Sequence, residues 1–156
     1  MGGYGSGRSG SRITKESCLV LDIYYLQRRE LLNGHYGVYR WTNTNTGEEI
    51  ASIALRTDES GQIMVLSYKV RVKGEKREVE ETFSLESTPT NFSGRRYWAL
   101  CPRCWRRCGK LYLPSGGVHF RCRRCYNLTY RSCNESRKED WCSVLLRRAW
   151  ERQYGR

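Results

Sequence analysis

Two cysteine pairs are the residues of this sequence whose types and spacing most clearly predict chemistry. Cys101 and Cys104 form the first pair, and Cys122 and Cys125 form the second, each with two residues between its members. Structural Zn²⁺ sites hold the ion in a tetrahedron of thiolates or imidazoles, and each C-x₂-C turn supplies two ligands. The 17 residues that separate the pairs fall within the usual range for such sites. The spacing therefore predicts one zinc ion bound by all four thiolates.

Two neighbouring side chains are alternative ligands. Cys108 follows the first pair and His119 precedes the second, so either could replace one of the four thiolates. A closed set of four cysteines is typical of a structural site, whereas catalytic zinc sites usually keep one position open. The H-x-E motif that accompanies P-C-x-x-C in zinc deaminases is not present. We therefore expect the metal to stabilise the fold and the protein to be no enzyme.

The basic charge of the chain is concentrated around these cysteines. The formal net charge is +12, yet residues 1–86 contain twelve basic and twelve acidic residues and are neutral. Residues 87–134 contain ten basic residues, nine of them arginine, and no Asp or Glu. Such a block repels itself and usually has an anionic partner, and the planar guanidinium of arginine suits phosphates and base edges. This composition predicts that the region binds nucleic acid, either DNA or RNA.

Arginines lie within and beside the cysteine pairs and alternate with aromatic residues. A bound metal would fix the backbone here, so that long side chains project from a rigid base and rings can stack on bases. At least half of these rings are expected in the core, with Trp105 and Tyr126 exposed because each directly follows a cysteine pair. The predicted nucleic-acid-binding residues are Arg8, Arg12, Arg95, Arg96, Arg103, Trp105, Arg106, Arg107, Lys110, Arg121, Arg123, Arg124, Tyr126 and Arg131.

The elements expected in the first half are a helix and a set of strands. Residues 1–12 are rich in Gly and Ser, which predicts a flexible tail. Asp22 is a plausible N-cap of a helix that ends at Asn33-Gly34. The apolar side of this helix would consist of Ile23, Leu26, Leu31 and Leu32. Runs of β-branched and aromatic residues predict antiparallel strands at 36–41, 50–55, 63–72 and 79–85.

The second half predicts a small metal-binding module and a helix. A strand at 95–100 leads into the first cysteine pair, and a hairpin of 110–113 with 118–121 separates the pairs. Acidic residues early and arginines late predict a helix over 134–153. The predicted fold class is α+β, in which a helix and a small antiparallel sheet (13–94) precede a zinc ribbon (95–132) and a C-terminal helix (133–156).

Several short motifs resemble those of a known family. The start Met1-Gly-Gly-Tyr-Gly-Ser-Gly-Arg8, with Gly109-Lys-Leu-Tyr-Leu-Pro114 and Leu128-Thr-Tyr130 beside the cysteine pairs, resembles a family of small uncharacterised bacterial and phage zinc-ribbon proteins. The similarity runs along the whole chain. It implies a zinc ribbon in a bacterium, phage or mobile element and implies no particular reaction. Cys108 departs from the pattern, because an ordinary residue is expected there.

Three alternatives to a nucleic-acid-binding protein are a membrane-associated protein, a protein-binding module and a nuclease. No apolar run approaches the ~18 residues of a transmembrane helix, and the start lacks an apolar signal segment, so we expect a cytoplasmic protein with no membrane partner. The alternative to nucleic acid is a protein partner, in which case the chain is a protein-binding module or phage-encoded inhibitor that docks on a host nucleic-acid-processing machine. A lesser alternative is a metal-dependent nuclease that uses Asp58-Glu59 or Glu75.

Overall fold

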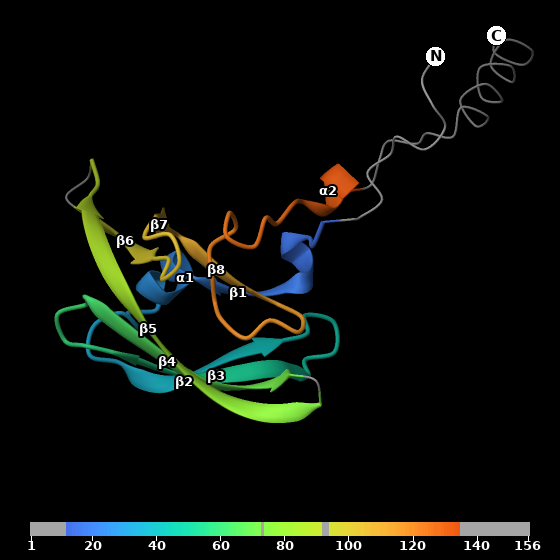
Figure 1. Cartoon of the computed structure of the whole chain (residues 1–156). Helices are drawn as coiled ribbons and strands as arrows, with labels where there is room; N and C mark the ends of the chain where they lie inside the picture. The colour runs from blue at the N-terminus through green and yellow to red at the C-terminus, as the bar shows by residue number, and fades with distance from the viewer. Residues whose placement is uncertain (1–11, 73, 92–93, 135–156) are drawn as a thin grey trace, which may run out of the picture.

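The computed structural model describes residues 12–72, 74–91 and 94–134, which form a fold built mainly of β-strands (Figure 1). The elements in chain order are η1 (Lys15–Ser17), β1 (Cys18–Asp22), α1 (Ile23–Arg28), β2 (Tyr36–Thr42), β3 (Glu49–Thr57), β4 (Ile63–Val72), β5 (Glu75–Pro89), β6 (Arg95–Leu100), β7 (Arg107–Cys108), β8 (Lys110–Pro114) and α2 (Arg131–Asn134). In these ranges no helix has the length and apolar character needed to cross a membrane.

Six of the strands form one curled antiparallel sheet in the order β2-β3-β4-β5-β6-β7. The curl comes from β5, a strand of 15 residues that changes partner along its length. Its residues 75–84 pair with β4, and its residues 85–89 pair with β6. Figure 1 shows β5 bending upwards, away from β4 and towards β6. This bend places β6 and β7, which flank the first cysteine pair, above the concave face of the sheet.

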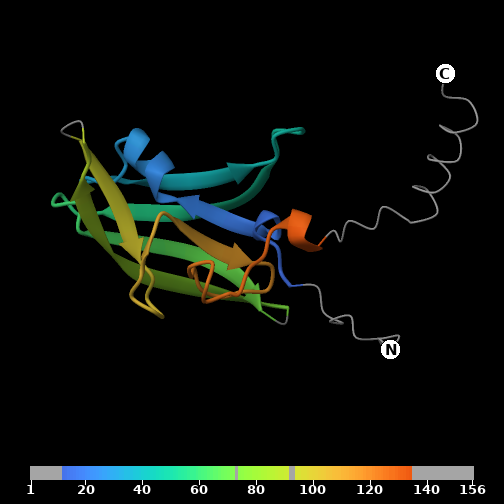
Figure 2. The ribbon, with the colours of Figure 1, turned by 90° about the horizontal axis from the view of Figure 1, so that it is seen from above.

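A second, two-stranded sheet covers the concave face. β1 pairs with β8 in antiparallel register from Cys18 opposite Pro114 to Asp22 opposite Lys110. Figures 1 and 2 show both strands lying across the larger sheet. β8 lies between the two cysteine pairs in the sequence. Its pairing with β1 therefore attaches the N-terminal part of the described chain to the cysteine-containing region.

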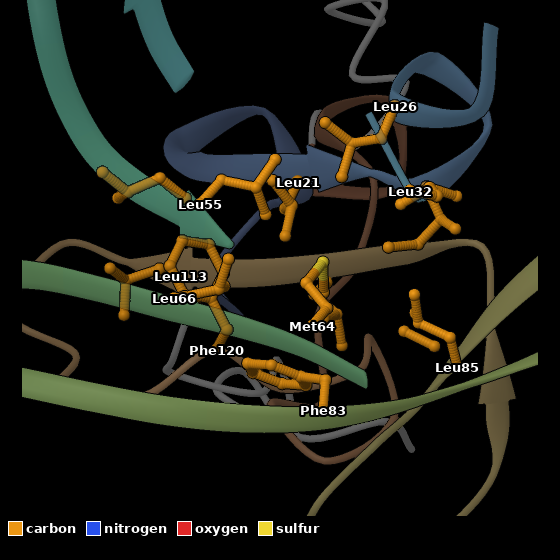
Figure 3. Close-up of a cluster of buried hydrophobic side chains, with 14 of the residues drawn as sticks. Leu21, Leu26, Leu32, Leu55, Met64, Leu66, Phe83, Leu85, Leu113 and Phe120 are labelled. Carbon is orange, nitrogen blue, oxygen red and sulfur yellow. The ribbon is translucent and has the colours of Figure 1, made fainter. Parts of the chain in front are cut away.

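The hydrophobic core lies between the two sheets. Alternate residues of β3, β4 and β5 point into it, which is the period of two expected for a sheet with one buried face. The buried side chains at its centre are Leu21, Leu26, Leu32, Leu55, Met64, Leu66, Phe83, Leu85, Leu111, Leu113 and Phe120 (Figure 3). Each Leu, Met or Phe buried in this way stabilises the fold by roughly 1.5–3 kcal/mol. Since Leu111 and Phe120 belong to this cluster, the core continues into the region of the cysteines.

The prediction of an α+β fold is wrong, because the described chain is mainly β and its longest helix has six residues. Asp22 caps α1 as predicted, and its Oδ1 accepts hydrogen bonds from the backbone N–H groups of Tyr24 and Tyr25 at 3.0 and 3.3 Å. The helix ends at Arg28, and Glu30 adopts a positive φ of 57° that breaks the helical path. Only the first apolar turn packs on the core as a helix, while the residues before Asp22 form β1.

One further expectation for the second half also differs from the structure, and another is not described by it. Residues 118–121 form no strand; within them only Arg121 makes an isolated bridge, to Tyr112, and β8 pairs with β1 instead. The helix predicted over 134–153 lies outside the described residues except for its first residue, as does the tail up to residue 11. The domain boundary at 94/95 stays a prediction, and the strands on its two sides, β5 and β6, pair with each other.

Candidate metal centre and basic groove

The four cysteines predicted from their spacing lie together, with all sulfur atoms within 4.8 Å of one another. Cys101 Sγ is 3.7 Å from Cys125 Sγ, and Cys104 Sγ is 3.6 Å from Cys122 Sγ. Four sulfurs placed tetrahedrally at a Zn–S distance of about 2.3 Å would be about 3.8 Å apart. A disulfide requires about 2.05 Å, so these thiols have the separation of metal ligands. The group can hold a metal ion.

Each cysteine pair occupies a tight turn, and we call residues 101–105 and 122–126 the two knuckles. In the first, which lies in the loop between β6 and β7, the carbonyl of Cys101 accepts hydrogen bonds from the N–H groups of Cys104 (3.2 Å) and Trp105 (2.8 Å). Trp105 has a positive φ of 56°. This left-handed conformation costs an L-residue about 1–2 kcal/mol. The closed turn therefore holds a bulky residue in a strained backbone.

Backbone N–H groups make one of the four thiols easier to ionise. The N–H of Cys122 donates to Cys101 Sγ at 3.4 Å. Burial disfavours the Cys101 thiolate, but backbone N–H groups, among them those of Cys122 and Arg103, outweigh burial and lower the pKa of this thiol to about 7. Burial raises the pKa of the Cys122 and Cys125 thiols. A bound cation would reverse that effect, because a thiol that coordinates a metal releases its proton to the solvent and binds as the thiolate.

The two alternative ligands have other partners. Cys108 Sγ donates to the carbonyl of Ala99 at 3.1 Å, and burial raises the pKa of this thiol to about 12. His119 Nδ1 lies 3.1 Å from Glu81 Oε1. Neither side chain belongs to the group of close sulfur atoms, which consists of the four predicted cysteines.

A buried carboxylate joins the second knuckle to the large sheet. Glu81 lies on β5 and is 8% exposed. Its oxygens accept hydrogen bonds from the Tyr68 hydroxyl at 2.6 Å, from the N–H of Phe120 at 2.8 Å and from Arg121 Nη1 at 2.6 Å. Because Phe120 and Arg121 directly precede Cys122, this carboxylate fixes the segment that carries one of the four close cysteines. Sequence patterns did not indicate this role of Glu81.

A groove of about 830 Å³ lies beside the knuckles, with walls from β6, β7, β8 and the second knuckle. Its cationic side chains are Arg12, Arg96, Arg106, Arg107, Lys110, Arg123 and Arg124. Three aromatic rings, those of Trp98, Tyr112 and Tyr130, also line it, and no Asp or Glu is among the described residues of its wall. We call this feature the basic groove.

The basic groove contains half of the residues predicted to bind nucleic acid. Those that are described but lie outside its wall are Arg95, Arg103, Trp105, Arg121, Tyr126 and Arg131, and Arg8 is outside the described residues. Trp105 is exposed as predicted, at 69%, whereas Tyr126 is half-buried and its hydroxyl donates to the carbonyl of His119. Binding by any of these residues stays a prediction.

Folding neutralises part of the acid-free stretch. Three of its cations pair with acids from the first half of the chain, namely Arg107 with Glu86, Lys110 with Asp22 at 2.9 Å and Arg121 with Glu81 at 2.6 Å. By contrast, Arg103, Arg106 and Arg124 are exposed and make no ion pair with any acid of the described ranges. Of these three, Arg106 and Arg124 line the basic groove.

Comparison of the chain with protein-family models, with curated proteins and with solved structures found no match. The resemblance to bacterial and phage zinc-ribbon proteins therefore stays a prediction. The function has to be inferred from the chemistry of the metal centre and of the basic groove.

Proposed function

We propose that the protein is a non-enzymatic nucleic-acid-binding protein that contacts phosphates and bases through the basic groove. One structural zinc ion would hold the knuckles at its edge. The observation that carries the proposal is the groove itself, in which seven cationic side chains and three rings meet without an acid among the described residues of the wall. Phosphate contacts from Lys and Arg supply most of the affinity in non-specific nucleic-acid binding.

The chemistry of the ligand set supports zinc as the metal. Soft thiolates favour Zn²⁺ over hard cations such as Mg²⁺ and Ca²⁺, which take oxygen ligands. Four sulfur ligands complete a tetrahedron and leave no position for water or substrate. The ion would therefore stabilise the two knuckles and take no part in a reaction.

The electrostatics of the groove support an anionic partner. Arg106 and Arg124 are exposed and make no ion pair with the described acids, so their full charge is available to a phosphate. An arginine can bind a phosphate through two parallel N–H···O bonds, which gives geometry as well as attraction. Arg124 lies in the second knuckle, and the carbonyl of Arg106 accepts a hydrogen bond from the N–H of Cys101 at 3.1 Å, so the backbone at both residues is already fixed before binding.

A double variant tests this function. We expect R106A/R124A to bind a short oligonucleotide about thirtyfold more weakly than the wild type in fluorescence anisotropy. This estimate assigns roughly 1 kcal/mol to each lost charge-assisted contact. The matched control is R56A/R71A, which removes the same charge from exposed residues of β3 and β4, strands that do not line the groove. We expect the control to bind within about threefold of the wild type, since only long-range attraction is reduced.

Equal losses in the two double variants would show attraction to the net charge and would contradict a binding site in the groove. Undetectable binding by the wild-type protein at low salt would reject nucleic acid as the partner. In that case the alternative, docking on a host nucleic-acid-processing protein, becomes the function to test.

A further inference from the structure

The described part of the protein lacks the elements that usually read a duplex. Side chains reach base edges in the major groove from an α-helix or a free two-stranded ribbon. The longest described helix, α1, has six residues, and the two-stranded sheet β1–β8 packs Leu21 and Leu111 into the core. The basic groove is a hollow of about 830 Å³, within the size range of small-molecule sites. Unpaired nucleotides can enter such a hollow, whereas a duplex would rest on its rim.

Two guanidinium groups in the groove lie over aromatic rings. Arg96 Cζ lies 4.2 Å from the ring centre of Trp98, and Arg123 Cζ lies 4.4 Å from that of Tyr130. The indole N–H of Trp98 donates to Thr88 Oγ1 at 3.0 Å, which holds that ring in place. Arg123 Nη1 donates to the Tyr130 hydroxyl at 3.0 Å, which holds the second pair together. Hydrogen bonds thus fix the Arg123 guanidinium, and Arg96 lies over a ring that is itself held in place.

Such a fixed cation suits an unpaired base. A guanidinium packed on a ring with one face can receive a nucleobase on its other face and a phosphate at its edge. Lys15 Nζ also lies over the Tyr130 ring, 4.1 Å from its centre, so two cations contact this ring, and Arg123 is the exposed one of the two. The bases of a duplex are stacked on each other and cannot offer their faces in this way.

Trp105 adds a third flat surface near the groove. Its side chain is 69% exposed, and its backbone is held at a positive φ of 56° by the first knuckle. It lies next to Arg106, which lines the groove. A large exposed ring in a strained conformation is a feature that occurs at binding sites.

If the basic groove binds nucleic acid as proposed, we infer that it takes a single strand. The bases would stack on the guanidinium planes of Arg96 and Arg123 and on the ring of Trp105. The phosphates would contact Arg106 and Arg124, whose guanidinium groups do not lie over an aromatic ring. The ligand is thus an unpaired stretch of RNA or DNA, bound mainly by stacking and charge.

The test compares a labelled strand of about a dozen nucleotides with the same strand annealed to its complement. We expect the wild type to bind the single strand at least about tenfold more tightly than the duplex at the same salt concentration, which corresponds to one stacked base. In R96K/R123K the charge is kept and the planar surface is lost, so we expect the preference to fall below about threefold. The matched control, R106K/R124K, should keep the preference, because lysine also binds phosphates.

The metal content of R96K/R123K is measured to check that this variant is folded. A second variant, at an exposed position, keeps the test decisive if R96K/R123K is misfolded. Trp105→Ala removes an exposed ring, and we expect it to weaken single-strand binding several-fold and to leave duplex binding unchanged. Equal or tighter binding of the duplex by the wild type would overturn the inference and leave the proposed function standing. An unchanged preference in both R96K/R123K and Trp105→Ala would overturn it as well. Undetectable binding of both probes would reject the proposed function itself.

Discussion

Replacing Cys122 by serine is expected to release the bound zinc and unfold the two knuckles. Structural zinc contributes roughly 10–16 kcal/mol of apparent binding free energy in small zinc modules, while a whole domain is stable by only about 5–15 kcal/mol. Cys122 is buried, its sulfur lies 3.6 Å from that of Cys104, and among the described residues the group of close sulfurs contains no fifth ligand that could replace it. Elemental analysis should find one zinc per wild-type chain and none in the variant, and thermal unfolding should show the loss of stability.

The matched control for this prediction is Cys108→Ser. Cys108 is also in the cysteine-rich region, but its sulfur donates to the Ala99 carbonyl and lies outside the metal group. We expect this variant to keep one zinc and a melting temperature close to that of the wild type, since a hydroxyl can make the same hydrogen bond. Retention of zinc by Cys122→Ser, or its loss from Cys108→Ser, would show that the ligand set is a different one.

Replacing Glu81 by alanine is expected to destabilise the protein by about 3–5 kcal/mol. The change leaves Arg121, whose side chain is 19% exposed, without its carboxylate, and leaves the N–H of Phe120 without an acceptor. Removal of one partner of a buried ion pair has a cost of this size, because the remaining charge is uncompensated. Burial and the adjacent carboxylate also raise the pKa of Tyr68, so its hydroxyl stays protonated and loses an acceptor too. Urea denaturation at constant zinc concentration measures the difference.

The neighbouring Glu80→Ala serves as the control for Glu81→Ala. Glu80 is exposed, and its carboxylate accepts a hydrogen bond from Ser67 at 3.1 Å. We expect its loss to change the free energy of unfolding by less than about 0.5 kcal/mol. Because Phe120 and Arg121 lead into Cys122, Glu81→Ala should also weaken zinc binding in a competition with a chelator, whereas Glu80→Ala should not. Equal stability and zinc affinity of the two variants would contradict the role given to Glu81.

Local patterns were sufficient to predict that the four cysteines lie together and to predict several strands. The C-x₂-C spacing predicts a shared site because each turn brings its own two sulfurs together, and the structure confirms the group of four. The strand predicted at 63–72 coincides with β4 (Ile63–Val72), whose β-branched and aromatic residues alternate between its two faces. The N-cap at Asp22 was also predicted correctly, because its side chain bonds to Tyr24 and Tyr25, which are close in sequence, so that a local pattern is enough to reveal it.

Pairings between distant segments could not be predicted in this way. β1 pairs with β8, far along the chain, and nothing within Cys18–Asp22 shows that partner. The strand β1 was therefore not predicted. The helix predicted after Asp22 was too long at its other end, because α1 ends at Arg28 and Glu30 adopts a positive φ of 57°. β5 extends well beyond the predicted 79–85 because one part of it pairs with β4 and the other part pairs with β6.

The same limit applies to the charges of the candidate site. A count along the sequence finds no acid in residues 87–134, yet Glu81 lies forty positions from Arg121 in sequence and pairs with it. Arg121 pairs with Glu81 in the fold, and the prediction that it contacts nucleic acid stays untested. The basic groove as a shape arises only when Arg12, β6, β8 and the second knuckle come together, so the sequence predicted its charge and not its geometry.

The salt dependence of binding tests the central proposal most directly. Each phosphate neutralised by a cation releases counterions, so the logarithm of the binding constant falls linearly with the logarithm of the salt concentration. With about six phosphates in contact, we predict a slope of about −4 for a single strand and about −5 for a duplex. A slope close to zero would contradict binding through phosphates in the basic groove.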